Sequence, residues 1–317
     1  MALMGSTNFI FAGLKNRSST FPNCLGQRNS AFVPVSSSPV ITQIRGNNIQ
    51  MEAATEPADT IDHDIMQQQE VDEELMLAAG LREEAMPKHV AILPDGHSRW
   101  AKQRGQPVQF GHETLAPVNE VICRLCCKFG IKVLTSYLSS TETWHRSKDE
   151  VDYLMILFEE GMRSNLEKSI KEGIRISIIG DRTKLPESLL EAITEAEEIT
   201  KVNSRLHLIL AIGYGGRNEI VRACKNVCKR VKDGLIGEEE IDEKIFEQEL
   251  ETSIAQYPLD LLIRPAGEFR LSNFFLYQSA YAELYFTKTL SPDFEEEDFI
   301  RALKSYQERN RRYGKRP

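Results

Sequence analysis

Apolar and polar positions follow two alternating periods from residue 88 onward. Short apolar runs predict strands at 89–93, 131–137, 174–179, 206–212, 260–263 and 282–286. Apolar positions at helical spacing predict helices at 112–129, 151–171, 185–200, 219–232 and 294–309, and a further helical stretch across Trp100. Strands that alternate with long helices form βα units. We therefore expect a single α/β domain with a mainly parallel central sheet flanked by helices.

Residues 1–86 precede this pattern and differ from it in charge. Residues 1–51 contain four basic residues and seven serines but no Asp or Glu, a composition typical of a transit peptide. The serine content and the small number of arginines favour a plastid transit peptide over a mitochondrial one. A plain unstructured tail is the alternative. Residues 52–86 hold eleven acidic residues against the single Arg82, which predicts a disordered acidic linker whose end, 71–81, is helical. The folded domain is expected at 87–317.

Composition excludes several classes of protein. The 317 residues are 41% hydrophobic with a net charge of −8, which argues against a nucleic-acid partner. No run approaches the ~18 apolar residues that a transmembrane helix needs, so no such segment is expected. Cys123-x-x-Cys126 has no second pair at zinc-site spacing. The six cysteines are therefore expected to be free thiols in a reducing compartment.

A polar loop at 94–100 follows the first strand and opens a helix. Gly96 permits a turn there, and the free N–H groups at the helix start, together with Arg99, suit an anion. A lone carboxylate beside such an anion, Asp95, suits Mg²⁺ bridged to phosphate oxygens. A simple helix cap is the alternative for Asp95. His112, at the start of the next helix, is a second candidate for contacting phosphate.

Two further polar loops follow other predicted strands. The first carries small hydroxyls, an aromatic and an arginine: Ser140, Thr143, Trp144 and Arg146. This set suits substrate positioning, and equally an ordinary cap for the next helix. The second loop, 264–273, carries Arg264, Arg270 and Ser272, which can converge on a diphosphate. A solvated surface loop is the alternative there.

Segments 89–101, 140–146, 211–217 and 260–286 together resemble the cis-prenyltransferase (undecaprenyl diphosphate synthase-like) family. The resemblance runs from about residue 87 to 314. It implies a homodimer in which each chain has one α/β sheet and a hydrophobic tunnel. It also implies Mg²⁺ as cofactor, and dimethylallyl or isopentenyl diphosphate as substrates. The Asp-Asp-x-x-Asp motif of the all-helical trans-prenyltransferases does not occur.

The resemblance assigns roles to individual residues. Asp95 corresponds to the aspartate that holds Mg²⁺, and Glu283 to a carboxylate that assists the metal near the second diphosphate. Trp144 and Glu150 correspond to positioning residues. The residues that correspond to the first diphosphate site are Gly96, Arg99, His112 and Arg146. Those that correspond to the second diphosphate site are Arg264, Arg270 and Ser272. Ser98 and Trp100 are further candidates for substrate binding.

Several positions depart from the family pattern. His97 and Thr143 stand where the family usually has Asn, Pro265 and Ala266 replace Thr-Gly, and Val108 replaces a phosphate-binding arginine. The groups that hold the diphosphates are retained, whereas the neighbourhood of the acceptor alkene changes. Because proton removal depends on geometry at about the ångström scale, this change is expected to redirect the carbocation. His97, Ser140 and Thr143 are therefore catalytic candidates beside Asp95.

These departures predict a short-chain plant enzyme. It would join two dimethylallyl diphosphates head-to-middle into a branched diphosphate of the lavandulyl type, with Leu138 shortening the tunnel. One alternative is head-to-tail synthesis of neryl or a longer cis-prenyl diphosphate from isopentenyl diphosphate. An alternative of another class is a noncatalytic partner subunit of a cis-prenyltransferase.

Overall fold

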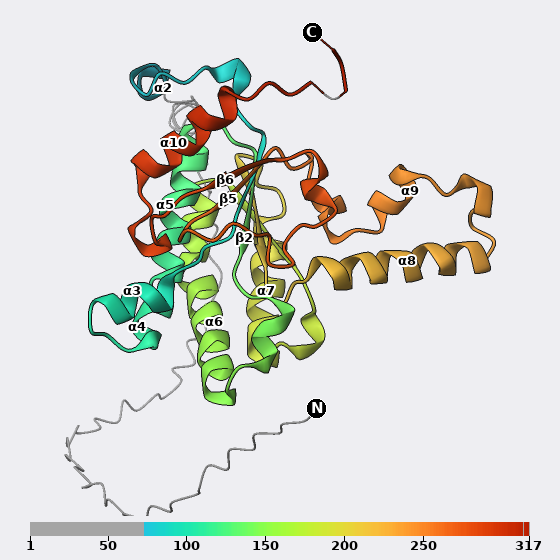
Figure 1. Ribbon diagram of the computed structural model, residues 1–317. Helices are drawn as coiled ribbons and strands as arrows, with labels where there is room; N and C mark the ends of the chain where they lie inside the picture. The colour runs from blue at the N-terminus through green and yellow to red at the C-terminus, as the bar shows by residue number, and fades with distance from the viewer. Residues whose placement is uncertain (1–72, 313, 317) are drawn as a thin grey trace, which may run out of the picture. The chain divides into compact units, whose positions relative to one another are not determined.

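The computed structural model describes residues 73–312 and 314–316, so the predicted transit peptide and the first part of the linker lie outside the described residues. Within them the chain forms a six-stranded sheet in the order β3-β4-β2-β1-β5-β6 (Figure 1). The strands are β1 (His89–Ile92), β2 (Val133–Tyr137), β3 (Ile174–Ile179), β4 (Leu206–Ala211), β5 (Leu261–Arg264) and β6 (Glu283–Phe286). Each pair of neighbours is parallel, which confirms the predicted α/β class.

Nine helices accompany the sheet in the described part of the chain. They are α2 (Glu73–Ala78), α3 (His97–Gln103), α4 (Val108–His112), α5 (Leu115–Lys128), α6 (Lys148–Lys171), α7 (Glu187–Thr200), α8 (Gly216–Lys232), α9 (Glu243–Gln248) and α10 (Glu296–Gln307). In Figure 1, α5, α6 and α10 lie together on one side of the sheet, and α8 and α9 extend away from it on the other. The short polar α9 was not predicted, because six residues are too few to show a helical period.

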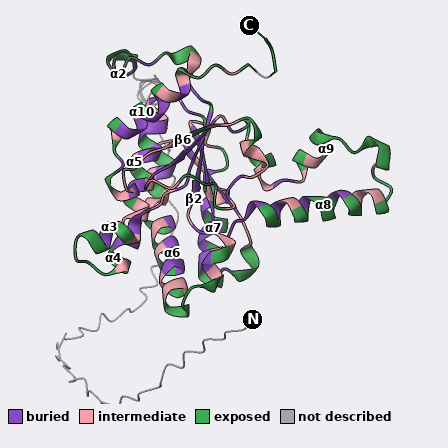
Figure 2. Cartoon of the chain, in the orientation of Figure 1, coloured by how far each residue is buried: buried purple, intermediate pink, exposed green. Residues whose placement is uncertain are grey.

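The core reflects the alternation of side chains along each strand. Val90 and Ile92 of β1 pack in a cluster with α5 and α10, whereas Ala91 between them packs with Phe274 and Phe275. A third cluster joins α6, α7 and β3, for example through Phe158. Figure 2 shows the buried positions concentrated on the strands. Because both faces of the strands are covered, they appear in the sequence as apolar runs rather than alternating ones.

The folded region begins earlier than residue 87. Met76, Leu81 and Met86 are buried in the cluster that also contains α5 and α10. The Arg82 backbone N–H donates to the Gln307 side chain at 3.0 Å, which fixes this segment to α10. The helical end predicted for the linker is therefore present as α2. The residues from Met76 to Met86 are part of the fold rather than of a disordered linker, because their few apolar side chains find partners on α10.

Membrane-spanning potential and the state of the cysteines can be described for the residues that the structure places. No helix among residues 73–312 is long and apolar enough to cross a membrane. The five cysteines in this range are free thiols: Cys123 and Cys126 are buried, Cys127 is half-buried, and Cys224 and Cys228 are exposed. No group of three potential ligands from His, Cys, Asp and Glu is found in the described part of the chain.

Two histidines inside the sheet make stability depend on pH. His89 Nε2 lies 2.9 Å from Thr135 Oγ1, and His207 Nε2 lies 2.8 Å from Ser177 Oγ. Burial lowers the pKa of both to about 4, from an ordinary 6.5. Between pH 6.5 and 4 the unfolded chain therefore binds more protons, so the free energy of unfolding should fall as the pH falls through this window.

We expect each of these histidines to contribute about 1–2 kcal/mol of this loss between pH 7 and pH 5. The measurement is urea unfolding at both pH values for the wild type and His207→Gln. The variant should lose less stability on acidification, while the exposed-loop control His145→Gln should behave as the wild type does. An unchanged pH dependence in His207→Gln would contradict the assignment.

Candidate active site

The turn after β1 places Asp95 at the start of α3. Gly96 has φ 95°, a left-handed conformation that favours glycine. A Cβ there would lie 2.8 Å from a methyl of Leu290 and 3.0 Å from the Ala266 methyl, so the turn has no space for a side chain. The Gly96 N–H donates to Asp95 Oδ1 at 2.6 Å. The turn therefore fixes the carboxylate at the carboxyl edge of the sheet, where ligands bind in such folds.

Asp95 is joined to the loop that follows β5. Arg264 Nη2 donates to Asp95 Oδ2 at 2.9 Å, and Arg99 Nη2 lies 3.6 Å from Asp95 Oδ1. Arg264 is almost completely buried, and its Nη1 donates to Ser272 Oγ at 2.7 Å. These contacts follow from the strand order, because β1 and β5 are neighbours and both residues lie at the same edge. Asp95, Arg264 and Ser272, which the sequence assigned to two different loops, form one cluster.

The loop after β5 is held in an unusual backbone conformation. Ala266, Ser272 and Asn273 have positive φ angles of 75°, 47° and 63°. Each non-glycine residue in this region costs about 1–2 kcal/mol, so the surrounding structure must compensate. Two contacts do so at Ala266: its N–H donates to the Thr289 carbonyl at 2.7 Å, and its carbonyl accepts from Arg99 at 3.0 Å. Such strain is typical of functional sites.

Eight of the predicted site residues line one cavity of about 150 Å³ beside this cluster. They are Asp95, Gly96, His97, Ser98, Arg99, His112, Thr143 and Arg146. The remaining lining residues are Pro94, Leu115, Leu138 and Leu154. The cavity therefore combines the N-terminus of α3, two arginines and one carboxylate, which is an arrangement suited to an anion that carries a divalent cation.

His97 presents an unpaired acceptor in this cavity region. Its Nδ1 lies 2.7 Å from Thr114 Oγ1 and 3.2 Å from the Gly111 carbonyl, and Thr114 Oγ1 itself donates to that carbonyl. Nδ1 must then carry the ring proton, which leaves Nε2 as an acceptor. Nε2 is buried and has no partner among the described residues. Burial lowers the pKa of His97 to about 4, so the ring is neutral at physiological pH.

A second histidine is part of a charged wall. His112 Nε2 lies 3.3 Å from Glu150 Oε1, and Arg146 Nη1 donates to the same oxygen at 2.9 Å. Burial lowers the pKa of His112, while the Glu150 carboxylate opposes this effect. Glu150 thus contacts both His112 and Arg146.

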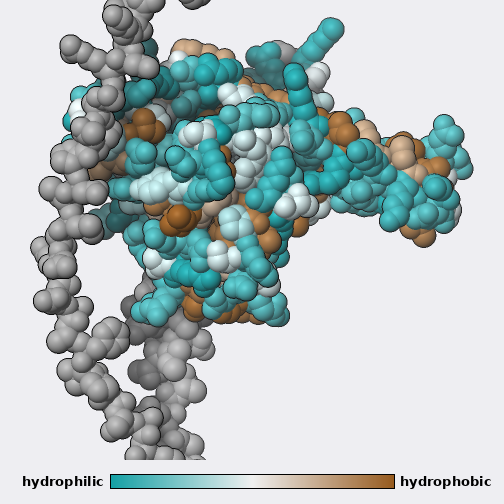
Figure 3. Space-filling model, turned by 90° about the horizontal axis from the view of Figure 1, so that it is seen from below, coloured by the Kyte–Doolittle hydropathy of each residue, from teal (hydrophilic) through white to brown (hydrophobic). Residues whose placement is uncertain are grey.

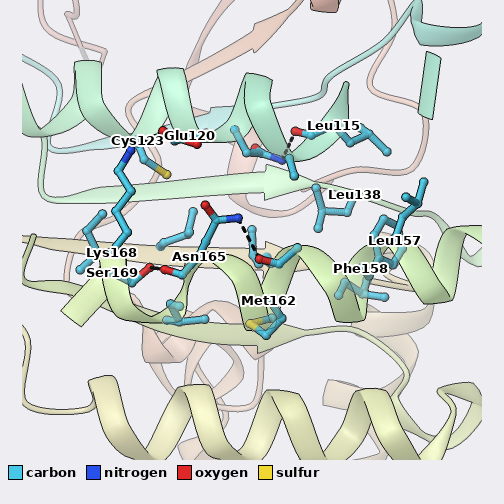
Figure 4. A pocket seen from close by; sticks show the side chains of 18 of the residues that line it. Leu115, Glu120, Cys123, Leu138, Leu157, Phe158, Met162, Asn165, Lys168 and Ser169 are labelled. Carbon is cyan, nitrogen blue, oxygen red and sulfur yellow. Dashed lines mark hydrogen bonds and ion pairs between the residues drawn. The ribbon is translucent and has the colours of Figure 1, made fainter. Parts of the chain in front are cut away.

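A second, apolar cavity of about 120 Å³ adjoins the first between α5 and α6 (Figure 4). The two cavities share His112, Leu115 and Leu138. Phe158, Met162 and strand residues of β3 and β4 form much of the apolar wall. The site therefore has an end whose lining suits an anion and an end whose lining suits a hydrocarbon, and the two share lining residues. Leu138 lines both cavities, and its predicted effect of shortening the tunnel stays a prediction.

Seven predicted site residues lie outside the lining of both cavities: Arg264, Arg270 and Ser272 at and after the end of β5, Glu283, and Ser140, Trp100 and Trp144. The last three act through their neighbours. Trp100 stacks on Phe110 with 5.7 Å between ring centroids, and its Nε1 donates to Asp293 at 2.7 Å. Trp144 packs over Gly213, where a Cβ would lie 3.0 Å from the ring. The Ser140 N–H donates to Thr143 Oγ1 at 3.1 Å. These contacts position the loops rather than reach the cavity.

Glu283, the second residue predicted to assist a metal, lies apart from Asp95 within one chain, and its role stays a prediction. It is the first residue of β6 and pairs with Leu261, three residues before Arg264 in β5. At the usual rise of a strand, its backbone is therefore about 10 Å from that of Arg264, toward the opposite edge of the sheet. Its carboxylate lies 4.0 Å from Arg309 Nε instead. Within one chain Glu283 does not join Asp95, because strand β6 enters the sheet at the edge away from the site.

Two contributors were not assigned a role from the sequence. Glu268 Oε1 lies 3.1 Å from Arg99 Nη1, and Glu268 also pairs with Arg270, so it holds arginines from both loops. Thr114 orients His97. Glu268 could not be found from local spacing, because it is far from Arg99 in the sequence. For Thr114 the only signal was its place next to the predicted helix start.

Comparison with known proteins assigns the chain to a family. The model of the family described as putative undecaprenyl diphosphate synthase matches residues 93–314. The chain belongs to this cis-prenyltransferase family. It is 50% identical over 246 residues to dehydrodolichyl diphosphate synthase 2 of Arabidopsis thaliana, covering 77% of this chain and 79% of the relative. It is 53% identical over 232 residues to a chloroplastic (2Z,6Z)-farnesyl diphosphate synthase of Solanum lycopersicum, covering 73% and 80%.

Solved structures confirm the fold of this cis-prenyltransferase. Lavandulyl diphosphate synthase from Lavandula x intermedia, crystallised with dimethylallyl diphosphate, is 46% identical with a TM-score of 0.72, covering 73% of this chain and all of that one. A probable undecaprenyl diphosphate synthase from Campylobacter jejuni is 34% identical with a TM-score of 0.59, covering 72% and 99%. The chain is therefore a member of a prenyltransferase enzyme family whose relatives include both branched-product and cis-prenyl synthases.

Proposed function

We propose that this chain condenses two dimethylallyl diphosphates head-to-middle into lavandulyl diphosphate, with release of diphosphate. The observation that carries the proposal is the neutral, unpartnered Nε2 of His97 beside the cavity that contains Asp95 and Thr143. His97 and Thr143 are the positions where the chain departs from the family's two amides. The similarity to the structure of a lavandulyl diphosphate synthase also supports the proposed head-to-middle condensation.

The first diphosphate fits the cavity at the start of α3. Its oxygens would accept hydrogen bonds from backbone N–H groups at 97–99 and from Arg99 and Arg146, all of which belong to residues that line this space. Asp95 has the chemistry to hold Mg²⁺ there, since Mg²⁺ is usually bound through one or two carboxylates and substrate phosphates. When bound, the ion supplies charge that stabilises the departing diphosphate. Leu115 and Leu138 direct the allylic tail into the apolar cavity.

The second diphosphate fits the cluster after β5, with Arg264, Arg270 and Ser272 as its donors. Its alkene would then attack the allylic cation in the adjacent cavity. One proton must leave the resulting tertiary cation, and His97 Nε2 is a buried, neutral acceptor for it. Arg264 bonds to both Asp95 and Ser272, so it couples the two diphosphate sites.

The size of the apolar cavity supports a short hydrocarbon. At about 120 Å³ it is comparable to the ~150 Å³ engineered cavity that accommodates one benzene ring. A tail of one or two isoprenyl units has a volume of that order. Leu138 narrows the entrance from the diphosphate end.

A second candidate function is head-to-tail synthesis of a neryl or longer cis-prenyl diphosphate from isopentenyl diphosphate. The relatives at about 50% identity favour it, since they are described as dehydrodolichyl and (2Z,6Z)-farnesyl diphosphate synthases. A noncatalytic partner subunit fits less well, because Asp95, Arg99 and Arg264 are retained and both arginines contact Asp95.

The deciding experiment is incubation of the purified chain with dimethylallyl diphosphate, alone and with isopentenyl diphosphate, in Mg²⁺. After dephosphorylation the alcohols are resolved by chromatography. Lavandulol from dimethylallyl diphosphate alone is the expected result. Linear products formed only with isopentenyl diphosphate would establish the second candidate instead, and activity only with an added cis-prenyltransferase would establish the partner subunit.

Arg270 offers a test of the second diphosphate site. Its side chain is 60% exposed and pairs with Glu268, so its removal should leave the fold intact. Calorimetry with the unreactive dimethylallyl thiolodiphosphate should show two sites in the wild type. Arg270→Ala should weaken one of them about tenfold and leave the other unchanged. Arg309→Ala, which removes an exposed arginine beside Glu283, is the matched control. An equal loss of affinity at both sites would refute the assignment of two separate diphosphate sites.

We further propose that two copies of the chain associate along β6 and the α8–α9 arm. Strand β6 is an edge strand, and Leu284 on it and Phe269 beside it are exposed. Figure 3 shows apolar residues among polar ones along the projecting arm, where Val221 and Leu235 are exposed. Sedimentation of the purified chain should give a dimer, and Leu284→Asp with Phe269→Asp should give a monomer.

We also propose that residues 1–51 direct the chain to the plastid. The composition of this segment supports the proposal, and several relatives from Solanum lycopersicum are described as chloroplastic. A fluorescent protein fused to residues 1–51 should be found in chloroplasts, and a fluorescent protein fused only to residues 52–86 should not.

A further inference from the structure

The apolar cavity ends in a group of charged side chains. Lys168 of α6 forms an ion pair with Glu120 of α5, and Lys168 Nζ also lies 3.9 Å from Glu172 Oε1. All three residues line the cavity. Figure 4 shows Lys168 reaching across to α5 at the end of the cavity away from Leu138.

The rest of the cavity is suited to hydrocarbon. Leu115 and Leu138 line the end shared with the diphosphate cavity, and Phe158 and Met162 line the middle. The polar Asn165 in this wall donates to the Gly161 carbonyl of its own helix at 2.8 Å. From Leu157 to Lys168 the helix advances roughly 16 Å at 1.5 Å per residue. A tail that enters past Leu138 therefore meets apolar side chains first and the ion pair last.

The ion pair lies where the cavity meets the surface. The side chains of Lys168, Glu120 and Glu172 are 41%, 47% and 31% exposed, so the charges stand at the surface while their stems face the cavity. A hydrocarbon that pushed between the charges would remove their water and their partner without offering a hydrogen bond in return. The pair is therefore a barrier to a growing or longer tail, although it adds little to the stability of the fold.

We propose that the Glu120–Lys168 ion pair is a latch that closes the far end of the cavity and sets the longest allylic tail that the chain accepts. This inference rests on the proposed function, since it takes the apolar cavity to hold the allylic tail. The latch acts on specificity, because it touches the end of the tail and not the reacting carbons.

The test is calorimetric binding of unreactive thiolodiphosphates with dimethylallyl, geranyl, farnesyl and geranylgeranyl tails. In the wild type the affinity should rise with tail length and then fall at the tail that reaches the latch. In the double variant Glu120→Ala/Lys168→Ala this fall should come at least one isoprenyl unit later. The first tail excluded by the wild type should then bind at least about tenfold more tightly.

Two control variants separate the latch from general loosening of α6. Arg163→Ala removes an ion pair that α6 makes with Glu195 of α7, away from the cavity, and should keep the wild-type limit. The charge exchange Glu120→Lys/Lys168→Glu should restore the limit that the double alanine variant loses.

The outcomes distinguish the latch from the function on which it rests. The latch is overturned if the wild type and the double alanine variant have the same tail-length limit, or if the wild type has no limit. In both cases the binding of the analogues still supports the proposed function. Failure of the wild type to bind any of the four analogues overturns the proposed function.

Discussion

Asp95→Asn is expected to lower the rate of product formation by about three orders of magnitude without unfolding the chain. The Gly96 N–H and Arg264 now donate to the two different oxygens of Asp95, at 2.6 and 2.9 Å, and the single amide oxygen can accept from one of them. It lacks the negative charge with which Asp95 would hold Mg²⁺ at the first diphosphate. The measurement is the steady-state rate in Mg²⁺ together with thermal unfolding of both proteins.

Asp293→Asn is the matched control for this change. Asp293 also pairs with an arginine, Arg104, at 3.0 Å and contacts α3 through Trp100, but it lines neither cavity. We expect its rate to stay near that of the wild type. A near-wild-type rate for Asp95→Asn would refute the assignment of the metal to Asp95. A large loss of thermal stability would instead show that the carboxylate serves to neutralise the buried Arg264.

The double variant His97→Asn/Thr143→Asn is expected to change the product from branched to linear. Both side chains line the same cavity and are almost completely buried, so new amides there would face the reacting carbons. Asparagine at these positions restores the family pattern and removes the His97 acceptor. With equal concentrations of dimethylallyl and isopentenyl diphosphate, the variant should form mainly head-to-tail product, resolved by chromatography after dephosphorylation.

Ala266→Gly tests the competing explanation for a branched product. Ala266 has φ 75°, and its methyl lies where it limits the Gly96 turn, so it could set the angle of the acceptor without touching the proton. If the double amide variant still makes only branched product while Ala266→Gly makes linear product, the loop after β5 controls the coupling. If the wild type makes only linear products, the proposal of a branched product is wrong.

Much of the fold was determined by the sequence alone. The strands are short, buried on both faces and rich in apolar residues, so they appear as continuous apolar runs that the local pattern predicts. The loop 94–100 was also predicted from a local pattern. A glycine that must adopt φ 95° and a carboxylate beside a helix start are local features, set by residues next to each other in the chain. The prediction of Asp95, Gly96, His97 and Arg99 around one site needed no knowledge of distant contacts.

The partners of these residues were decided only by the tertiary structure. Asp95 and Arg264 are 169 residues apart, and they meet because β1 and β5 are neighbours in the sheet. The strand order is not written in any local pattern. For the same reason Glu283, which looked like a metal ligand by resemblance, lies toward the opposite edge at the start of β6.

The state of each group was also decided by burial rather than by residue type. A histidine at position 97 is an ordinary titratable group in the sequence. In the fold it lies among Gly111, Thr114 and the cavity wall, so its pKa falls to about 4 and its Nε2 is left as an acceptor. The sequence by itself therefore determined which groups stand at the carboxyl ends of the strands. Packing determined which of them meet and which are charged, because desolvation and strand order depend on residues far apart in the chain.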